Sequence, residues 1–145
     1  MGRFVAIDYG LKRVGLAVSD EMQLIATKLT TVEEKDIFPF LQSYVSKENI
    51  ELFVVGLPKQ MNNQPSESAP YVKTFVKKLQ VYFASIPIYM IDERYTSKLA
   101  SQTIAHSGLK KKKRQEKSLI DTIAAVVILQ DFMTMYKNGK SLQRI

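Results

Sequence analysis

Four acidic residues of this chain stand where the surrounding apolar pattern predicts the end of a strand or the face of a buried helix. Asp8 closes the first apolar run, and Asp92 and Glu93 close a later one. Asp121 lies inside the longest apolar segment near the end of the chain. Three carboxylates from separate segments that converge would bind one or two divalent cations, which support phosphodiester hydrolysis.

Each of these carboxylates also has a structural alternative. Asp8, close to a glycine, is typical of a turn. Glu93 has cationic neighbours with which it could form a surface ion pair, and Asp121 near a helix start stabilises the positive end of the helix dipole. Their combination, more than any one of them, favours a metal site.

Asp121 is the most informative of the four. Its neighbours at helical spacing are Ala124, Ala125 and Ile128, so it lies on an apolar stripe with small residues. Alanines at these positions let a helix approach a sheet closely. A carboxylate on such a stripe needs a cation or hydrogen-bond donors, because burial of an unpaired charge costs several kcal/mol.

The composition restricts the metal that these carboxylates could hold. The chain has no cysteine, and His106 is its only histidine. Thiolate zinc sites, cysteine nucleophiles and histidine-rich metal sites are therefore excluded. Oxygen ligands remain, and they point to Mg²⁺ or Mn²⁺.

Positive charge favours a polyanionic partner. The formal net charge is +7 and the isoelectric point is about 9.5. Lys12 and Arg13 follow Asp8 closely, and a run of five cations precedes the segment of Asp121: Lys110, Lys111, Lys112, Lys113 and Arg114. Such a run is usually a solvated loop, and near a metal site it also contacts nucleic-acid phosphates. Most aromatic residues have core spacing, so the sequence predicts no base-stacking surface.

The pattern of the chain predicts an α/β fold in a single domain, residues 1–145. Expected strands cover residues 4–8, 14–19, 24–29, 52–56 and 86–91, and expected helices cover 36–46, 72–79, 97–106 and 118–136. A hairpin joins the first two strands, and Gly10 is expected to supply a positive φ there. This order predicts a mixed central sheet, led by a β-hairpin, with helices packed on it.

Four ordered motifs resemble the YqgF/RuvX family of Holliday-junction-resolvase-like proteins. They are DYGLKRVGLAVSD (8–20), GLP (56–58) with Met61, DERYTS (92–97) with Ala100, and IDTIAAVVILQ (120–130). One departure is visible, since Asn62 and Asn63 follow Met61 where the family usually has a glycine. The resemblance implies an RNase H-like fold. It also implies the activity of a metal-dependent nuclease that processes precursor 16S ribosomal RNA.

The resemblance also implies roles for individual residues. The acidic triad carries over onto Asp8, Glu93 and Asp121, with Asp92 as an alternative or additional middle ligand. From charge and position, together with the matching motifs, we predict nucleic-acid contacts at Lys12, Arg13, Arg94, Thr96 and residues 110–114. RNA is favoured over structured DNA, and a ribosome precursor is a possible partner.

Two other functions stay open from the sequence. One is resolution of four-way DNA junctions, and the other is a catalytically weak RNA- or ribosome-binding role. Asp8 follows only four apolar residues, so we expect no signal peptide, and no apolar run has the roughly 20 residues that span a bilayer. We therefore expect a cytoplasmic protein without membrane contact, either a monomer or a homodimer.

Overall fold

The computed structural model describes residues 2–57, 69–92, 117–137 and 143–144. Its elements are β1 (Arg3–Tyr9), β2 (Arg13–Ser19), β3 (Ala26–Glu33), the 3-10 turn η1 (Glu34–Asp36), α1 (Ile37–Lys47), β4 (Ile50–Leu57), α2 (Ala69–Tyr82), β5 (Ile88–Asp92), α5 (Lys117–Lys137) and β6 (Gln143–Arg144). The helix expected over residues 97–106 lies outside the described residues.

The strands form one mixed sheet in the order β3-β2-β1-β4-β5-β6. The first three strands form an antiparallel meander, whereas β4 is parallel to β1 and β5 is parallel to β4. The short β6 returns antiparallel to β5. The expected hairpin-led mixed sheet is thereby confirmed, and the carboxyl ends of β1, β4 and β5 lie at one edge.

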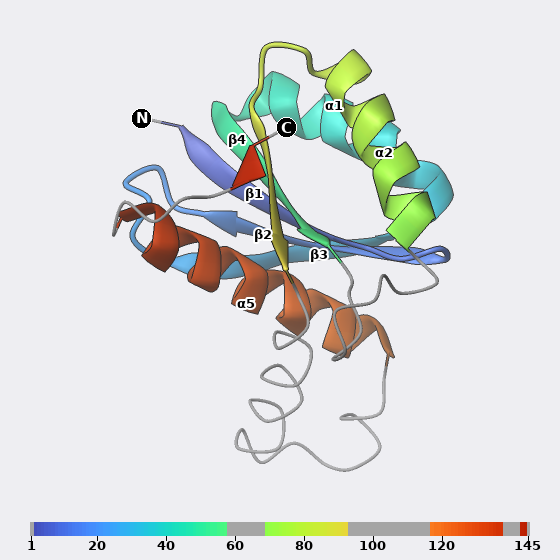
Figure 1. Ribbon diagram of the computed structural model, residues 1–145. Helices are drawn as coiled ribbons and strands as arrows, with labels where there is room; N and C mark the ends of the chain where they lie inside the picture. Colours follow the sequence, from blue (N-terminus) through green and yellow to red (C-terminus); the bar gives the residue numbers. More distant parts are fainter. Residues whose placement is uncertain (1, 58–68, 93–116, 138–142, 145) are drawn as a thin grey trace.

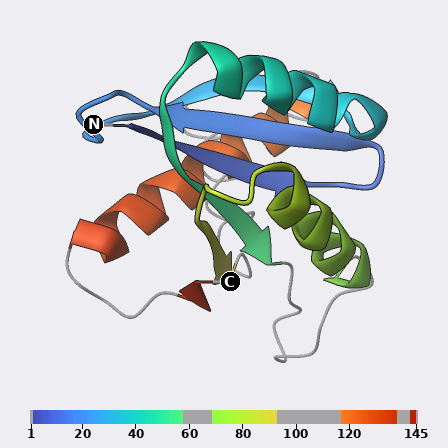
Figure 2. The same cartoon turned by 90° about the horizontal axis from the view of Figure 1, so that it is seen from above.

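Helices cover both faces of the sheet (Figure 1). Helices α1 and α2 lie on one face, and α5 crosses the other. The view from above shows α1 and α2 over the strands, with α5 passing behind them (Figure 2). Because side chains alternate along a strand, each strand supplies residues to two separate cores.

The core on the α1 and α2 face is the larger of the two. It unites odd-numbered residues of β1, such as Val5 and Ile7, with Leu41 of α1 and with Phe75 and Leu79 of α2. Pro39 and Pro70 lie in the first turns of their helices, where the missing backbone N–H leaves no hydrogen bond unmade.

The core on the α5 face is built around small residues. Ala6 of β1 pairs with Ala17 of β2, and both belong to one buried cluster with Ala125 of α5. Larger residues of α5, Ile128 and Phe132, fill the cluster further along the helix. Ala125 of α5 therefore packs in one cluster with alanines of the sheet, which fits the expectation that small residues let this helix approach the sheet closely.

The third strand begins at Ala26, two residues later than expected. A turn occupies the preceding residues, because one carboxylate oxygen of Asp20 accepts hydrogen bonds from the backbone N–H groups of Leu24 (2.7 Å) and Ile25 (2.9 Å). Those bonds also lower the pKa of Asp20, the bond from Ile25 most. Gln23 completes the turn with a left-handed φ of 60°.

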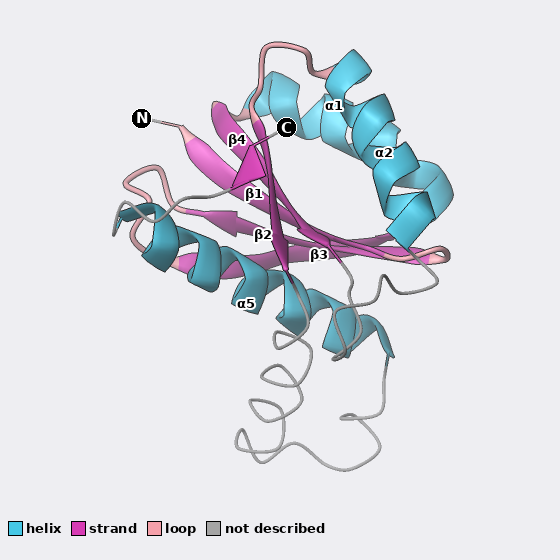
Figure 3. Ribbon diagram, viewed as in Figure 1, coloured by secondary structure: helices cyan, strands magenta, loops and turns pink. Residues whose placement is uncertain are grey.

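Figure 3 separates these elements by type and shows the sheet between its two helical layers. Among the described helices, none has both the length and the apolar character needed to cross a bilayer.

The alanine contact between α5 and the sheet can be tested by overpacking. Ala125→Leu adds a bulky side chain at a fully buried position, so we expect it to lower the free energy of unfolding by about 1–3 kcal/mol. Gln130→Leu, at an exposed position of the same helix, is the matched control and should change it by less than about 0.5 kcal/mol. Urea unfolding measures both. Equal effects of the two substitutions would contradict a close alanine contact.

Candidate active site

Asp8 lies half-buried near the carboxyl end of β1, on the face that α5 covers. It continues the row formed by Phe4 and Ala6, which both pack against α5. Its partner on β2 is Gly15. On β4, the residue level with Asp8 is Gly56, because the preceding residues of the two strands pair. Neither neighbouring strand therefore places a side chain directly beside this carboxylate.

The end of β5 lies at the same edge of the sheet. Asp92 is the last residue of β5 and pairs with Leu57, the last residue of β4. Since β4 alone separates β1 from β5, their backbones are about 10 Å apart. The structure describes only the backbone of Asp92, and Glu93 lies outside the described residues.

Helix α5 brings its first turns to this edge. The helix runs opposite to β1, because the rings of Phe132 and Tyr136 contact Phe4 at the start of that strand, with centroids 5.7 and 5.5 Å apart. From Phe4 to Asp8 the strand advances about 13 Å. From Phe132 back to position 121 the helix covers about 16 Å in the same direction. Both views agree that α5 begins at the side where β1 ends (Figures 1 and 2).

The structure thus brings three of the sequence-predicted segments to one edge: the ends of β1 and β5 and the start of α5. The side chain of Asp121 is not described, although its backbone lies one helical turn before the buried Ala125. Within the described part of the chain, no three acidic or histidine side chains form a metal-binding group. Arg94, Thr96 and residues 110–114 lie outside that part.

Two of the predicted cations are placed beside Asp8. Lys12 is exposed in the turn between β1 and β2, and its carbonyl oxygen accepts a hydrogen bond from the backbone N–H of Glu34 (2.9 Å). Arg13 begins β2, and strand alternation places it on the α5 face as the diagonal neighbour of Asp8. Both cations therefore border the carboxyl edge.

Gly10 is required in this turn for a different reason from the one expected. Its φ lies outside the left-handed region, so the expected positive φ is wrong. A Cβ atom at this position would lie 2.6 Å from the carbonyl oxygen of Arg13. The glycine therefore permits a close approach of two backbone segments, which holds the turn tight beside Asp8.

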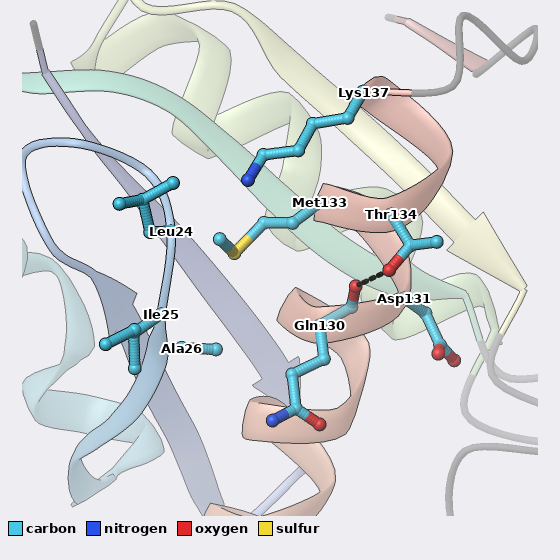
Figure 4. Close-up of a pocket in the computed structure, with 8 residues that line it drawn as sticks. All are labelled: Leu24, Ile25, Ala26, Gln130, Asp131, Met133, Thr134 and Lys137. Atoms are coloured by element: carbon cyan, nitrogen blue, oxygen red, sulfur yellow. Dashed lines mark hydrogen bonds between the residues drawn. The ribbon is translucent and has the colours of Figure 1, made fainter.

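One hollow in the described part of the chain lies away from this edge. It has a volume of about 620 Å³, between the turn at Leu24 and Ile25 and the last turns of α5 (Figure 4). Burial raises the pKa of Asp131, which is on its wall. Position 131 is about 15 Å along α5 from position 121, so this hollow is separate from the candidate site.

A smaller hollow of about 330 Å³ lies at the carboxyl edge, on the opposite face of the sheet from Asp8. Aromatic side chains line it, among them Tyr9 and the exposed Tyr71. This hollow was not expected from the sequence, which predicted no stacking surface. The available signal was the helical spacing of Tyr71, Thr74, Phe75 and Lys78 on α2, which places them along one stripe.

The sheet order, the two helical layers and the carboxylate near the end of the first strand define an RNase H-like fold. Two solved structures share it. The first, "T. thermophilus RuvC in complex with Holliday junction substrate", has a TM-score of 0.60 at 17% identity and covers 100% of both chains. The second, "Crystal structure of Fowlpox virus resolvase and substrate Holliday junction DNA complex", has a TM-score of 0.55 at 11% identity, over 92% of this chain and 98% of the other.

The family described as "RuvX: Holliday junction resolvase" matches residues 2–135, and the chain belongs to this family. A relative from Parabacteroides distasonis is 50% identical, over 94% of this chain and 98% of its own length. Another from Flavobacterium psychrophilum is 49% identical, over 92% of this chain and 98% of its own. Both carry the name "Putative pre-16S rRNA nuclease".

The environment of Tyr9 generates a prediction on alkaline stability. Burial, together with the hydrogen bond that its hydroxyl donates to Glu34 Oε1 (2.9 Å), raises the pKa of Tyr9 from 10.0 to about 12. The folded state thus favours the neutral phenol. This stabilisation is complete below pH 10 and is lost as the pH rises through 12.

Tyr9→Phe removes the titrating group. We therefore expect the wild-type protein to lose more stability than Tyr9→Phe between pH 10 and pH 12, as measured by urea unfolding at each pH. Parallel losses in the two proteins would show that Tyr9 is not held in this way.

Proposed function

We propose that this protein is a metal-dependent nuclease that hydrolyses phosphodiester bonds in precursor 16S ribosomal RNA, and therefore works in the cytoplasm. Membership of the RuvX family and the names of the relatives support a nuclease. The observation that carries the proposal is the convergence of the ends of β1 and β5 and the start of α5 at one edge of the sheet, with Asp8 on the face that α5 covers.

The proposed metal ligands are Asp8, Glu93 and Asp121, and the proposed metal is Mg²⁺ or Mn²⁺. The residues fit such an ion because the chain offers carboxylate oxygens and no thiolate. The glycines on both sides of Asp8 leave room beside its carboxylate. When bound, divalent metal lowers the pKa of water and stabilises charge on the leaving oxygen.

We assign the middle ligand to Glu93 and not to Asp92. Along β5, Tyr89 and Ile91 pack on the α5 side, together with the row that ends at Asp8. Ile88 and Met90 pack on the side of α1 and α2. If the alternation of β5 continued beyond Ile91, position 93 would have the parity of Tyr89 and Ile91. This parity supports Glu93 as the partner of Asp8.

Cations of the chain hold the nucleic-acid backbone in this proposal. Lys12 and Arg13 border the carboxyl edge beside Asp8, and we assign contacts with phosphates next to the cleaved bond to them and to Arg94 and Thr96. Two residues separate the run 110–114 from the start of α5 in the sequence. It would bind further phosphates without reading sequence.

The carboxylate assignment predicts graded effects on cleavage. Asp8→Asn, Glu93→Gln and Asp121→Asn should each reduce metal-dependent cleavage of precursor-type 16S RNA by at least about 100-fold. Asp92→Asn is the matched control and should retain activity within about fivefold, because the proposed middle ligand is Glu93. Labelled RNA in Mg²⁺, Mn²⁺ or EDTA measures the rates, with circular dichroism to verify folding. An inactive Asp92→Asn with an active Glu93→Gln would exchange the two roles.

A four-way DNA junction is the second candidate substrate, because the family is described as a Holliday junction resolvase. The same preparations are therefore tested on a labelled junction. Cleavage of the junction in preference to RNA, lost in Asp8→Asn, would replace the RNA proposal. Binding without metal-dependent cleavage of either substrate would favour the catalytically weak binding factor.

The lysine run generates a prediction on salt dependence. Replacement of residues 110–114 by alanine should reduce the slope of log K against log salt by about 0.7 for each phosphate of single-stranded RNA that the run neutralises. Lys47→Ala, an exposed lysine at the end of α1, removes a charge away from the carboxyl edge and should leave the slope unchanged. Fluorescence anisotropy at several salt concentrations measures both. An unchanged slope in the alanine variant would remove the run from the interface.

A further inference from the structure

The aromatic hollow at the carboxyl edge has the size of a site for a small planar ligand. Its volume of about 330 Å³ is near the lower end of the range for ligand pockets. The walls come from three separate places: Tyr9 from the end of β1, Glu34 and Phe38 from η1 and α1, and a stripe of α2. Elements that the sheet fixes in place therefore hold the hollow open.

Four of its seven lining residues are aromatic. Tyr9 stacks on Phe75 with ring centroids 4.5 Å apart, and Phe38 lies 5.4 Å from Phe75. Phe75 is buried and forms the floor, whereas Tyr71 is 53% exposed at the rim. An exposed tyrosine beside a fixed aromatic floor offers a stacking surface to a planar ring.

Polar groups at the same hollow select the kind of planar ring. Glu34 lines it, and one oxygen of its carboxylate accepts the hydroxyl of Tyr9. An ionised carboxylate only accepts hydrogen bonds, so a base that meets it must offer hydrogen-bond donors, which on a base are N–H groups. Lys78 also lines the hollow, where its charge favours an attached phosphate and disfavours a cationic side chain.

The hollow lies next to the proposed active site. Tyr9 immediately follows Asp8, so their Cα atoms are about 3.8 Å apart. Their side chains point to opposite faces of the sheet, because the strand alternates. A nucleic-acid strand that crosses the carboxyl edge would therefore pass both the carboxylate and the aromatic hollow.

We propose that the hollow formed by Tyr9, Glu34, Phe38, Tyr71, Phe75 and Lys78 binds one unstacked nucleobase of the substrate strand, near the cleaved phosphate, and that it prefers guanine. The inference rests on the proposed nuclease function. Guanine is preferred because its N1–H and N2 amino group present two adjacent donors to a carboxylate, whereas adenine presents its amino group alone. Tyr71 stacks on the base, and Lys78 contacts its phosphate.

Binding of short RNA in EDTA tests this inference apart from cleavage. The probes are fluorescein-labelled single-stranded hexauridine carrying one central guanosine, and the same RNA carrying adenosine. The wild-type protein should bind the guanosine probe more tightly. Tyr71→Ala should weaken binding of both probes about tenfold. Glu34→Gln should abolish the preference for guanosine, with a smaller loss in affinity.

Tyr136→Ala is the matched control, since Tyr136 is an exposed tyrosine of α5, on the opposite face of the sheet. It should leave the affinity for both probes unchanged. Equal affinities of Tyr71→Ala and wild type would overturn the inference, as would equal losses in Tyr71→Ala and Tyr136→Ala. Absence of any RNA binding by the wild type would also overturn it.

The outcomes separate this inference from the proposed function. If the wild type cleaves RNA but Tyr71→Ala binds and cleaves as well as wild type, the base site fails and the nuclease stands. If no RNA is cleaved but Tyr71→Ala still loses affinity and Glu34→Gln loses the preference, the base site stands without the nuclease. Retention of the preference in Glu34→Gln would remove the carboxylate from recognition of the base.

Discussion

The close contact of α5 with the sheet is the constraint on which the rest of the site depends. Ala6, Ala17 and Ala125 have almost no side chain to separate the helix from the strands, so the helix lies close against β1 and β2. The same packing fixes the direction of α5, because its last turns contact the start of β1. The first turns, with position 121, are thereby held at the end of β1 that carries Asp8. A longer side chain at any of these alanines would alter that distance.

Because β1, β4 and β5 are parallel, their carboxyl ends lie at one edge of the sheet. Consecutive residues of β1 at that edge belong to opposite faces of the sheet. Asp8 and Tyr9 are consecutive residues, yet one belongs to the α5 face and the other to the face of α1 and α2. We have assigned hydrolysis to the first face and base recognition to the second. A turn held tight by Gly10 joins β1 to β2, so the register of the two residues cannot slip without loss of the hairpin. The proposed catalytic residue Asp8 and the proposed base-binding residue Tyr9 then lie on one strand with a fixed register.

The described elements were largely predictable from the sequence because their apolar periodicity is strong. The strands β1, β2 and β4 and the helices α1, α2 and α5 follow the expected spacing within a few residues. The start of β3 differed because the Asp20 side chain bonds to the backbone of the following turn, which periodicity does not report. The two-residue β6 carries no pattern.

The role of Gly10 and the aromatic hollow both depend on atoms from distant segments, so only the fold reveals them. The end of β1, the end of β5 and the start of α5 share one edge of the sheet, and the roles of the predicted carboxylates stay predictions.

The aromatic contact between Phe4, Phe132 and Tyr136 anchors the end of α5 that lies far from the proposed active site. Position 121 lies about 16 Å along the helix from Phe132. If α5 tilted rigidly by about 4° about this contact, position 121 would move by about 1 Å. A misplacement of that size can lower a reaction rate about 100-fold. Substitutions of Phe4 or Phe132 would then act on catalysis from a distance, through the angle of one helix.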